Sequence, residues 1–476
     1  MIRMLRPLYF LIFILSISIF FSSFAFSHSD SSYYDLRRVV PSDRNSEYNP
    51  KLYLGKIHDQ GDFETCWAYA AIEAIEYQMR KHYIAKGEFN KAKNVAFSHR
   101  YLAWTGYLAP GDIWANSPFA KSKKEFFKLG GDLFTAAHAI MQYGLIEERH
   151  MPWKGNRDKD NHVKEIVQPV LRIHDVIYKP GTFYNNIQEI KALLRKYGAA
   201  DITINRKVIR GAFFADKKET VLNPNLKEID SDHGTTLIGY DDNFKIKIKG
   251  KNYQGAWIIH DSSGDDIGEN GYLYILYADK AIKDFMVYIP EFDLQRYSRY
   301  ISSFGPHTEP LTYPILHNKH IKSLIIANNY TVTSAQDLKA IGLFVGVDNA
   351  QYRIEIYEAP YEALDENNDG KLLHEQEGFF GKKAKAGESN IEEGLAGYRI
   401  IDLSKPIPMP KNKEVSVLVQ ITAPKGQNIR FVILGNVLKR TKDDNGAIAF
   451  DDEDLERLDM PYFTGIFTKY RTNNLN

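Results

Sequence analysis

The hydrophobic pattern of the chain changes along its length from helical periodicity to short, strand-like runs. Apolar residues recur at spacings of three and four in three early segments, which predicts helices over residues 66–79, 132–143 and 187–197. Three later runs are short and either apolar or alternating, which predicts strands over residues 235–240, 244–249 and 256–259. Helices followed by strands predict an α+β unit with two lobes.

A second region begins near residue 297 and contains almost no helical periodicity. It consists of short strand-like runs separated by turn residues, at 322–327, 340–347, 352–357, 398–403, 414–421 and 430–434. This pattern is typical of a β-sandwich or jelly roll. We therefore expect a first domain over residues 28–292 and an all-β sandwich domain over residues 297–476.

The first 27 residues are expected to be a secretory signal peptide. A short basic start precedes an apolar run from Leu8 to Phe21, which is shorter than a membrane span of roughly 20 residues. Ala25 and Ser27 have the small side chains expected at the −3 and −1 positions of a cleavage site. An uncleaved anchor is the alternative. We expect a mature protein that is secreted or periplasmic and has no membrane span after cleavage.

The charge balance argues against one class of partner. Lys and Arg total 61 against 60 Asp and Glu, and a large nucleic-acid interface needs a net basic surface. No nucleic-acid partner is therefore expected.

No metal or other cofactor is expected either. Five histidines show no zinc-ligand spacing and are interpreted as structural or solvated: His99, His138, His150, His260 and His374. The segment Asp365–Gln376 fits the first half of a calcium-binding loop, but its twelfth residue is Gln376 instead of the bidentate Glu such a loop needs. A polar hairpin turn is the alternative for this segment.

Cys66 is the only cysteine of the sequence, and it stands at the start of the first predicted helix. A secreted chain usually keeps no cysteine or an even number, so this thiol is either a buried small hydrophobe or a reactive group. The positive end of the helix dipole favours the thiolate, which is the nucleophilic form. The charged residues Glu73, Glu76 and Arg80 fall outside the apolar stripe of the same helix.

Gln60 and two later residues complete a candidate catalytic set. The side-chain amide of Gln60 can lie beside the backbone N–H of Cys66, and two such donors form an oxyanion hole. His233 opens the strand predicted at 235–240, and Asp261 follows the strand predicted at 256–259. A hairpin between these strands would bring the Asp261 carboxylate to the imidazole, where it would fix the tautomer and stabilise the imidazolium.

Four segments resemble, in order, the corresponding segments of papain-family cysteine peptidases. They are QGDFETCWAYAAIEA, GGDLFTAAHAIMQYGLIEERHMPW, DHGTTLIGY and GAWIIHDSSGDDIGENGYLYILY, which together extend from residue 60 to residue 277. The resemblance implies a fold of two lobes, a helical one that begins at Cys66 and a β-barrel-like one that carries His233. The active cleft would lie between the two lobes.

The resemblance also implies a role for each residue of the candidate set. Cys66 would be the nucleophile, His233 the general base and acid, and Gln60 an oxyanion donor. Asp261 stands where the family usually has Asn. We expect it to accept the same imidazole hydrogen bond and, through its charge, to raise the pKa of His233.

Four residues are implied to contact the substrate: Gly130, Gly131, Glu64 and Trp67. Gly131 would offer backbone groups to an extended peptide. Glu64 replaces a glycine of the family and would either favour a basic substrate residue or crowd the pocket. Ser263 stands where the family usually has Trp, so the apolar cover of the His–Asp hydrogen bond is lost or supplied elsewhere.

The region from residue 290 through residue 356 looks like the lectin-like domain that accompanies some bacterial members of the family. The leading hypothesis is therefore a secreted cysteine endopeptidase that hydrolyses polypeptides through a thioester at Cys66. Its β module would bind a glycan or cell-surface ligand for attachment or targeting. The alternatives are an acyl transferase or amidase on the same scaffold, and an inactive scaffold that binds protein or glycan.

Overall fold

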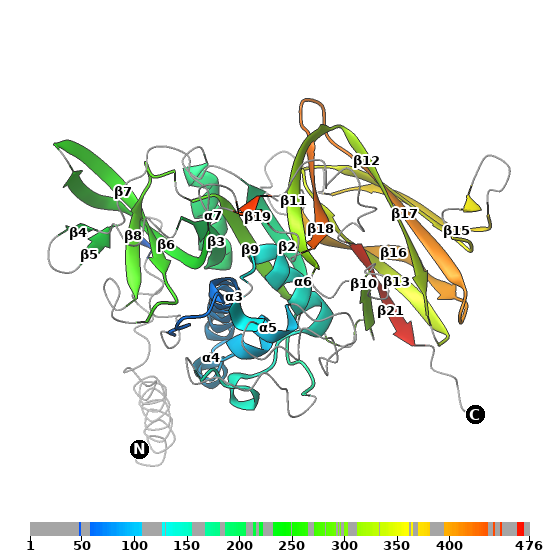
Figure 1. Ribbon diagram of the computed structural model, residues 1–476, viewed down its shortest axis with the longest axis horizontal. Helices are drawn as coiled ribbons and strands as arrows, with labels where there is room; N and C mark the ends of the chain where they lie inside the picture. The colour runs from blue at the N-terminus through cyan, green and yellow to red at the C-terminus, as the bar shows by residue number, and fades with distance from the viewer. Residues whose placement is uncertain are drawn as a thin grey trace, which may run out of the picture.

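The structure is a computed structural model, shown as a ribbon in Figure 1. It describes residues 47–48, 58–106, 126–128, 130–154, 167–180, 186–205, 213–215, 219–221, 232–248, 250–264, 271–280, 282–291, 294, 296, 299–302, 312–332, 334–360, 363–364, 370–380, 395–436, 441–442, 448–449 and 464–470. The predicted signal peptide and residues 365–369 of the candidate calcium loop lie outside these residues.

The described helices all lie in the first half of the chain. They are α3 (Cys66–Ala85), α4 (Phe89–Lys93), α5 (His99–Thr105), α6 (Leu133–Tyr143) and α7 (Ile187–Tyr197), with short 3-10 helices η2 (Phe126–Lys128) and η3 (Glu148–His150). The three helices predicted from periodicity are confirmed by α3, α6 and α7. None of the described helices is long and apolar enough to cross a membrane.

Local chemistry sets the start and end of α6. The Asp132 carboxylate accepts a hydrogen bond from the backbone N–H of Thr135 at 2.8 Å, and the Thr135 hydroxyl in turn accepts one from the backbone N–H of Asp132. This reciprocal capping satisfies donors that the first helical turn leaves unpaired. Gly144 ends the helix with a φ of 74°, a left-handed conformation that glycine adopts without a steric penalty.

The first part of the chain also forms a nine-stranded sheet in the order β2-β9-β3-β6-β7-β8-β5-β4, with β1 paired to β6. Its strands are β1 (Glu47–Tyr48), β2 (Arg172–Pro180), β3 (Ala200–Ile204), β4 (Phe213–Ala215), β5 (Glu219–Val221), β6 (His233–Ile248), β7 (Lys251–His260), β8 (Tyr272–Leu276) and β9 (Asp284–Glu291). The hairpin predicted between two of its strands is β6–β7, which pairs antiparallel.

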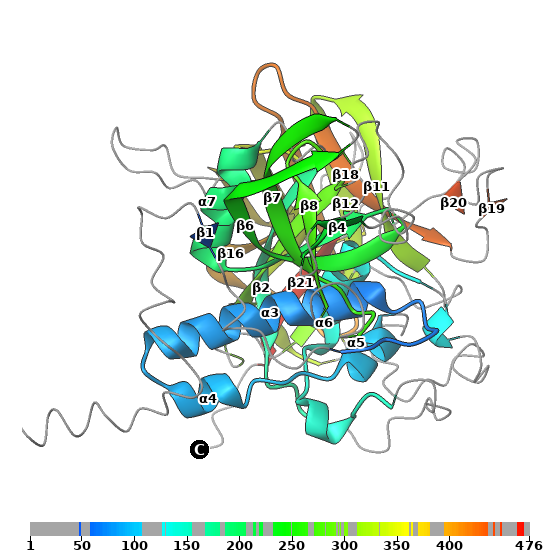
Figure 2. The same ribbon diagram turned by 90° about the vertical axis from the view of Figure 1, so that its left-hand side faces the viewer.

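Helix α3 runs along this sheet, and Figure 2 shows it passing below the strands. It packs against β6, β3 and β9, and its buried side includes Ile72 and Ile75. Glu73, Glu76 and Arg80, which fall outside the apolar stripe, are also buried, with exposed fractions of 4–5%. The helix is covered on nearly all sides by α4, α5, α6 and the sheet, so an apolar stripe alone does not define its buried surface.

The described residues of the second part of the chain form strands joined by turns and contain no α-helix. Two four-stranded sheets, β10-β21-β13-β16 and β12-β17-β14-β15, accompany the pairs β11-β18 and β19-β20. The strands are β10 (Arg299–Ser302), β11 (Thr312–Ile321), β12 (Ser323–Thr331), β13 (Gln336–Val345), β14 (Gln351–Tyr357), β15 (Leu372–Phe379), β16 (Gly397–Met409), β17 (Glu414–Thr422), β18 (Ile429–Asn436), β19 (Thr441–Lys442), β20 (Ile448–Ala449) and β21 (Thr464–Tyr470).

An aliphatic core lies between the two four-stranded sheets. It joins inward residues of β13 and β16, such as Ile341 and Ile407, to inward residues of β12, β14 and β17, such as Ile326 and Val417. Alternate residues of β14 are inward and buried while their neighbours are more exposed, which is the period-two pattern of a half-buried strand. The predicted β-sandwich is therefore present.

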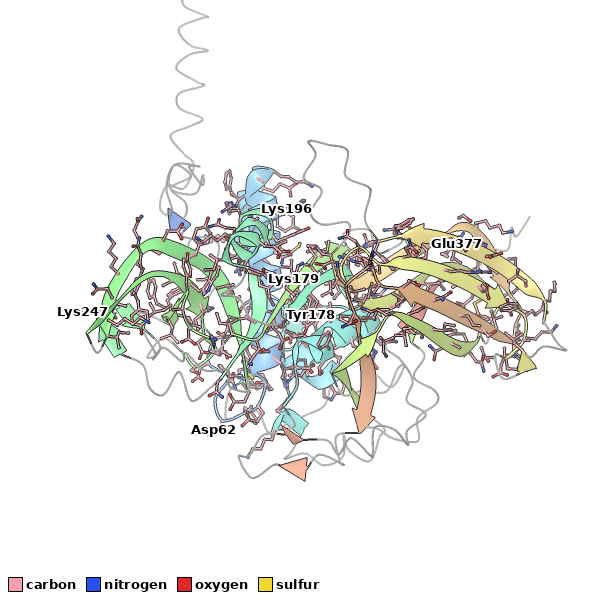
Figure 3. The ribbon with its side chains drawn as sticks, turned by 90° about the horizontal axis from the view of Figure 1, so that it is seen from above. Asp62, Tyr178, Lys179, Lys196, Lys247 and Glu377 are labelled. Atoms are coloured by element: carbon pink, nitrogen blue, oxygen red, sulfur yellow. The ribbon has the colours of Figure 1, made fainter. Side chains whose placement is uncertain are left out.

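The two parts of the chain share a close interface. The other face of β13 and β16 packs on α6 and β2, where the Phe344 ring lies 5.3 Å from that of Phe134 and 5.7 Å from that of Tyr178. Lys179, next to Tyr178 at this junction (Figure 3), bridges Glu189 and Asp348 at 2.7 Å each. Sheet β13–β16 is therefore covered on both faces.

Glycine is required where the backbones of the two parts meet. Gly397 has a φ of 145°, and a Cβ built on it would lie 1.8 Å from the carbonyl oxygen of Val176. Beside it, the backbone N–H of Tyr178 donates to the carbonyl of Ala396 at 2.8 Å. Any larger residue at position 397 would force β16 away from β2.

Candidate active site

Cys66 is the first residue of α3 and is 7% exposed. No side chain caps this helix at Thr65, whose hydroxyl is buried without a hydrogen-bond partner among the described residues. The first amides of a helix point away from its body and attract a negatively charged group. The thiol of Cys66 therefore lies at the positive end of a 20-residue helix.

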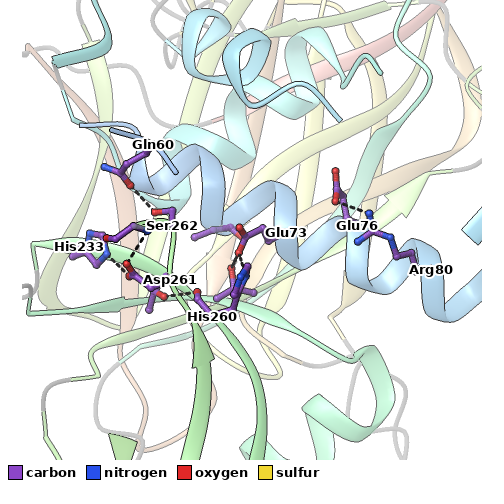
Figure 4. Close-up of polar contacts among 12 residues, drawn as sticks. Gln60, Glu73, Glu76, Arg80, His233, His260, Asp261 and Ser262 are labelled. Atoms are coloured by element: carbon purple, nitrogen blue, oxygen red, sulfur yellow. Dashed lines mark hydrogen bonds and ion pairs between the residues drawn. The ribbon is translucent and has the colours of Figure 1, made fainter. Parts of the chain in front are cut away.

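His233 and Asp261 are brought together by the β6–β7 hairpin. His233 begins β6, Asp261 directly follows β7, and the register pairs Thr236 with His260. The Nε2 atom of His233 lies 2.7 Å from Oδ2 of Asp261, and both side chains are buried (Figure 4). The adjacency predicted from the sequence is present, with Nε2 facing the carboxylate.

The electrostatic environment favours the charged forms of this pair. Burial lowers the pKa of His233, but the Asp261 carboxylate and the Cys66 sulfur outweigh it and raise that pKa to about 10. Burial acts to raise the pKa of Asp261, and the His233 imidazolium outweighs it, so that this pKa lies below its usual value. The expected effect of Asp261 on His233 is therefore confirmed in direction.

The next residue of β6 allows the histidine strand to approach the nucleophile. A Cβ built on Gly234 would lie 3.1 Å from Cα of Trp67 and 3.3 Å from the carbonyl carbon of Cys66. Both distances are shorter than almost all Cβ contacts in proteins, so a side chain would push β6 from the start of α3. Gly234 thus keeps His233 within reach of Cys66.

Gln60 is fixed by the residue that follows Asp261. Its Oε1 accepts a hydrogen bond from the Ser262 hydroxyl at 2.6 Å, and its backbone N–H donates to the Ser262 carbonyl at 2.8 Å. Its Nε2 donates to the carbonyl of Phe63 at 2.6 Å, which uses one of the two hydrogens of that amide. The segment before the nucleophile and the segment after β7 are therefore held as one unit (Figure 4).

The four residues implied to contact substrate have different positions. Gly130 and Gly131 are half-buried directly before α6, and Glu64 is exposed. Trp67 is only 2% exposed, and a Cβ built on Gly131 would lie 2.6 Å from the indole Nε1. Trp67 therefore lies beneath Gly131 and supports it, which leaves almost none of its surface for a ligand.

The structure brings further residues to the site that the sequence reasoning did not assign. Glu73 and His260 form a buried ion pair next to Asp261, and Ser262 orients Gln60. The sequence contains only a weak signal for these residues, which is the carboxylate of Glu73 two turns after Cys66 on the same helix. Among the described residues, no group of three or more His, Cys, Asp or Glu is placed to hold a metal ion.

Comparison with known proteins gives two matches along the chain. Residues 128–289 match the family described as papain family cysteine protease, and residues 310–441 match the lectin like domain. The first match contains His233 and Asp261 and begins after Cys66. Cysteine proteinase 1 of Zea mays is 26% identical over 228 residues, which are 47% of this chain and 53% of that protein. The chain thus spans about half the length of this curated relative.

Solved structures share the arrangement of both parts. The cysteine protease and lectin-like domains of Cwp84, a surface layer associated protein of Clostridium difficile, align with a TM-score of 0.57 and 14% identity. The alignment covers 94% of this chain and 95% of that one. A structure of clostridial Cwp84 after propeptide cleavage gives a TM-score of 0.56 at 14% identity, with 89% and 99% covered. The chain therefore has one region that matches the papain family cysteine protease model and one that matches the lectin like domain, in a fold similar to that of the Cwp84 structures.

Proposed function

We propose that this protein is a secreted cysteine endopeptidase that hydrolyses peptide bonds through a thioester at Cys66. The observation that carries the proposal is the buried His233–Asp261 pair, joined at 2.7 Å, against a helix whose first residue is the cysteine. Burying charged groups costs free energy unless they are paired, and such costs concentrate at functional sites. The similarity to papain-family proteases supports the same reaction class.

The arrangement gives each group one task in acyl transfer. Asp261 accepts the hydrogen bond from Nε2–H of His233, which leaves Nδ1 for the sulfur and the substrate. The Cys66 thiolate would attack the scissile carbonyl, and the His233 imidazolium would give its proton to the departing amine. His233 would then accept a proton from water, whose oxygen attacks the thioester, releases the acid and restores the Cys66 thiolate beside the His233 imidazolium.

Two donors are available for the oxyanion that forms in both steps. One is the backbone N–H of Cys66 at the start of α3, and the other is the second Nε2 hydrogen of Gln60. Ser262 holds the Gln60 amide in orientation through its hydroxyl. Donors that are fixed before the reaction stabilise the developing charge without reorganisation.

We further propose that an extended peptide lies along the backbone of Gly131 in a cleft between a helical lobe and a barrel-like sheet lobe within residues 28–292. Glu64 is exposed on the segment that leads to Cys66, where it would attract a basic substrate residue. The sandwich within residues 297–476 would bind a glycan or a cell-surface ligand. The surface-layer association of Cwp84 supports an extracytoplasmic location for this chain as well.

Labelling of the single thiol tests the proposal without a known substrate. Purified mature protein is treated with an epoxide inhibitor that alkylates papain-like enzymes, and its intact mass is measured. We expect one adduct, lost in Cys66→Ala and strongly slowed in His233→Ala. Absence of an adduct in a folded, reduced sample would instead support the inactive scaffold, and an excess of transfer to an added amine over hydrolysis would support the acyl transferase.

A further inference from the structure

A second buried ion pair lies next to the candidate catalytic residues. Nδ1 of His260 is 2.7 Å from Oε2 of Glu73, and the two side chains are 2% and 6% exposed. Glu73 belongs to α3, the helix that begins with Cys66, and His260 is the last residue of β7, directly before Asp261. Figure 4 shows the pair beside Asp261.

The same carboxylate oxygen also binds the histidine strand. The hydroxyl of Thr236 donates to Oε2 of Glu73 at 3.1 Å, and Thr236 lies three residues after His233 on β6. A single atom of α3 therefore holds both strands of the hairpin that carries His233 and Asp261. Ring contact of His260 with Tyr272 of β8, at 5.2 Å between centroids, fixes the imidazole from the other side.

Helical geometry explains why this connection coincides with the active site. Glu73 follows Cys66 by seven residues, which is close to two turns of about 3.6 residues each. Side chains at that spacing lie on the same face of a helix. The face that presents Cys66 to His233 therefore also presents Glu73 to Thr236 and His260. Helix α3 thus contacts the hairpin at two positions, about two turns apart.

Acidic and basic groups alternate across the site. In order they are the Cys66 thiol, the His233 imidazole, the Asp261 carboxyl, the His260 imidazole and the Glu73 carboxyl. The charges of Glu73 and Asp261 outweigh burial and raise the pKa of His260, whose positive charge in turn lowers the pKa of Asp261.

One more ionisable group faces this row from α3. Burial and the like charge of Glu73 raise the pKa of Glu76, whereas Arg80, His99 and the backbone N–H of Phe97 act to lower it. The outermost atoms of the pair, Oε1 of Glu73 and Nε2 of His260, have no hydrogen-bond partner among the described residues.

Stability alone does not account for such a pair. Replacing a buried ion pair by apolar residues of similar volume is often neutral or stabilising, whereas removing one partner leaves an expensive unpaired charge. The pair is therefore better explained by what it does to its neighbours than by a net gain in folding free energy.

We propose that Glu73 and His260 are positioning residues of the peptidase site. They hold the nucleophile helix at a fixed distance from the His233–Asp261 hairpin and place a positive charge behind Asp261 that adds to the effect of His233 in favouring the ionised carboxylate. This inference rests on the proposed function of Cys66 and His233. Neither residue touches the substrate or the reacting atoms.

The test measures the second-order rate of Cys66 alkylation by iodoacetamide as a function of pH. In Glu73→Gln, His260 loses its counter-charge and Asp261 loses the positive neighbour that favours its ionised form. We expect the acid limb of the profile to move to higher pH by about one unit and the maximal rate to fall about tenfold. Glu73→Asp keeps the charge but shortens the side chain, so it should keep the acid limb and lower only the rate.

The matched control is Glu76→Gln. Glu76 is a buried carboxylate one turn along the same helix, paired with Arg80 at 3.0 Å and with the backbone N–H of Phe97 at 2.7 Å. Those partners lie away from the hairpin, so this variant should lose stability and keep the acid limb of wild type. An apolar pair, Glu73→Leu with His260→Leu, should regain stability relative to Glu73→Leu and still lack the wild-type pH profile.

The outcomes separate the two proposals. Wild-type protein that is alkylated no faster than His233→Ala contradicts the proposed function, and with it the inference that depends on it. If wild type shows a fast, His233-dependent reaction but Glu73→Gln and the apolar pair keep the same pH profile, the positioning role alone is overturned.

Discussion

The two parts of this chain bury different kinds of side chain. Among the described residues, the papain-like part buries charged and polar groups such as Glu73, Arg80, Asp201, His233 and Asp261. The core of the sandwich is built almost entirely from Ile, Leu and Val. A buried charge is expensive unless it is paired, whereas aliphatic packing stabilises a fold directly. The difference fits the proposal that the first part carries the chemistry, while the aliphatic core of the second part contributes stability.

The interface connects the sandwich to the candidate active site through helix α6. Helix α6 begins directly after Gly131, and its Phe134 packs on Phe344 of the sandwich. Helix α6 also packs against α3. The sandwich therefore supports the segment on which the substrate is proposed to lie, although it contributes none of the proposed catalytic residues.

The largest expected effect breaks the contact between the two parts. Gly397→Val would place side-chain atoms against the Val176 carbonyl and force a left-handed backbone on a branched residue. We expect a loss of about 5 kcal/mol or more in the free energy of unfolding, measured in urea. Gly426→Ala is the control, because it also has a positive φ but no atom within 4 Å of the added Cβ. Equal losses in both variants would show that the clash is absent.

The next largest effects come from matched core truncations, one in each part of the chain, which compare how stability and Cys66 alkylation respond. Ile72→Ala in α3 and Ile341→Ala in β13 each remove a side chain that is at most 1% exposed. Each should lower the free energy of unfolding by roughly 2–5 kcal/mol. Only Ile72→Ala should also slow alkylation of Cys66, because it loosens the nucleophile helix. This prediction is contradicted if Ile341→Ala slows alkylation of Cys66 as much as Ile72→Ala does, under conditions where both variants are folded.

Removing the charge of Asp261 in the papain-like part should alter the pH dependence of Cys66 labelling. Asp261→Asn keeps a hydrogen-bond acceptor but removes the charge that helps to raise the pKa of His233 to about 10. The imidazolium, which supplies the proton for epoxide opening, is lost as pH rises through that pKa, so the alkaline limb of the epoxide-labelling profile should move to lower pH by about one unit or more, near 1.4 kcal/mol. Asp241→Asn, whose carboxylate accepts only backbone amides of β6, is the control. An unmoved limb would mean that Asp261 does not set the charge of His233.

The smallest effect concerns the ion pair across the interface. Lys179→Met removes the bridge between Glu189 and Asp348 but leaves Asp348 hydrogen-bonded to the backbone N–H of Ala396. The expected cost is about 1 kcal/mol, measured by thermal unfolding, and it should shrink at high salt. A loss of stability as large as that of Gly397→Val would show that the ion pair stabilises the interface as much as the close backbone contact at Gly397 does.

Much of the fold follows from the sequence pattern, and its failures have physical causes. Helices α3, α6 and α7 and the sandwich strands carry a periodic apolar pattern, and in α7 and β14 this pattern matches one buried face. Two expected strands, 235–240 and 244–249, are instead one strand, β6, with an irregularity at Asp241 whose carboxylate binds the amides of Asn243 and Phe244. Strand β3 was not predicted, because it is short and buried on both sides and so shows no alternation.

The candidate site was predictable only where a residue type carries its own chemistry. A lone cysteine at a helix start, a histidine at a strand start and an acid after the paired strand suffice to propose Cys66, His233 and Asp261. Glu73 and His260 are 187 positions apart in the sequence, and nothing local to either one indicates the other. Their pairing depends on how α3 lies against the sheet, which a pattern of hydrophobicity does not encode.

The single cysteine has one further consequence. No disulfide can form within this sequence, so the free energy of folding does not depend on the redox potential of the surroundings. A reductant that returns an oxidised Cys66 to its thiol form breaks no crosslink that the fold needs. Oxidation and reduction can therefore switch the proposed activity off and on while the scaffold stays intact.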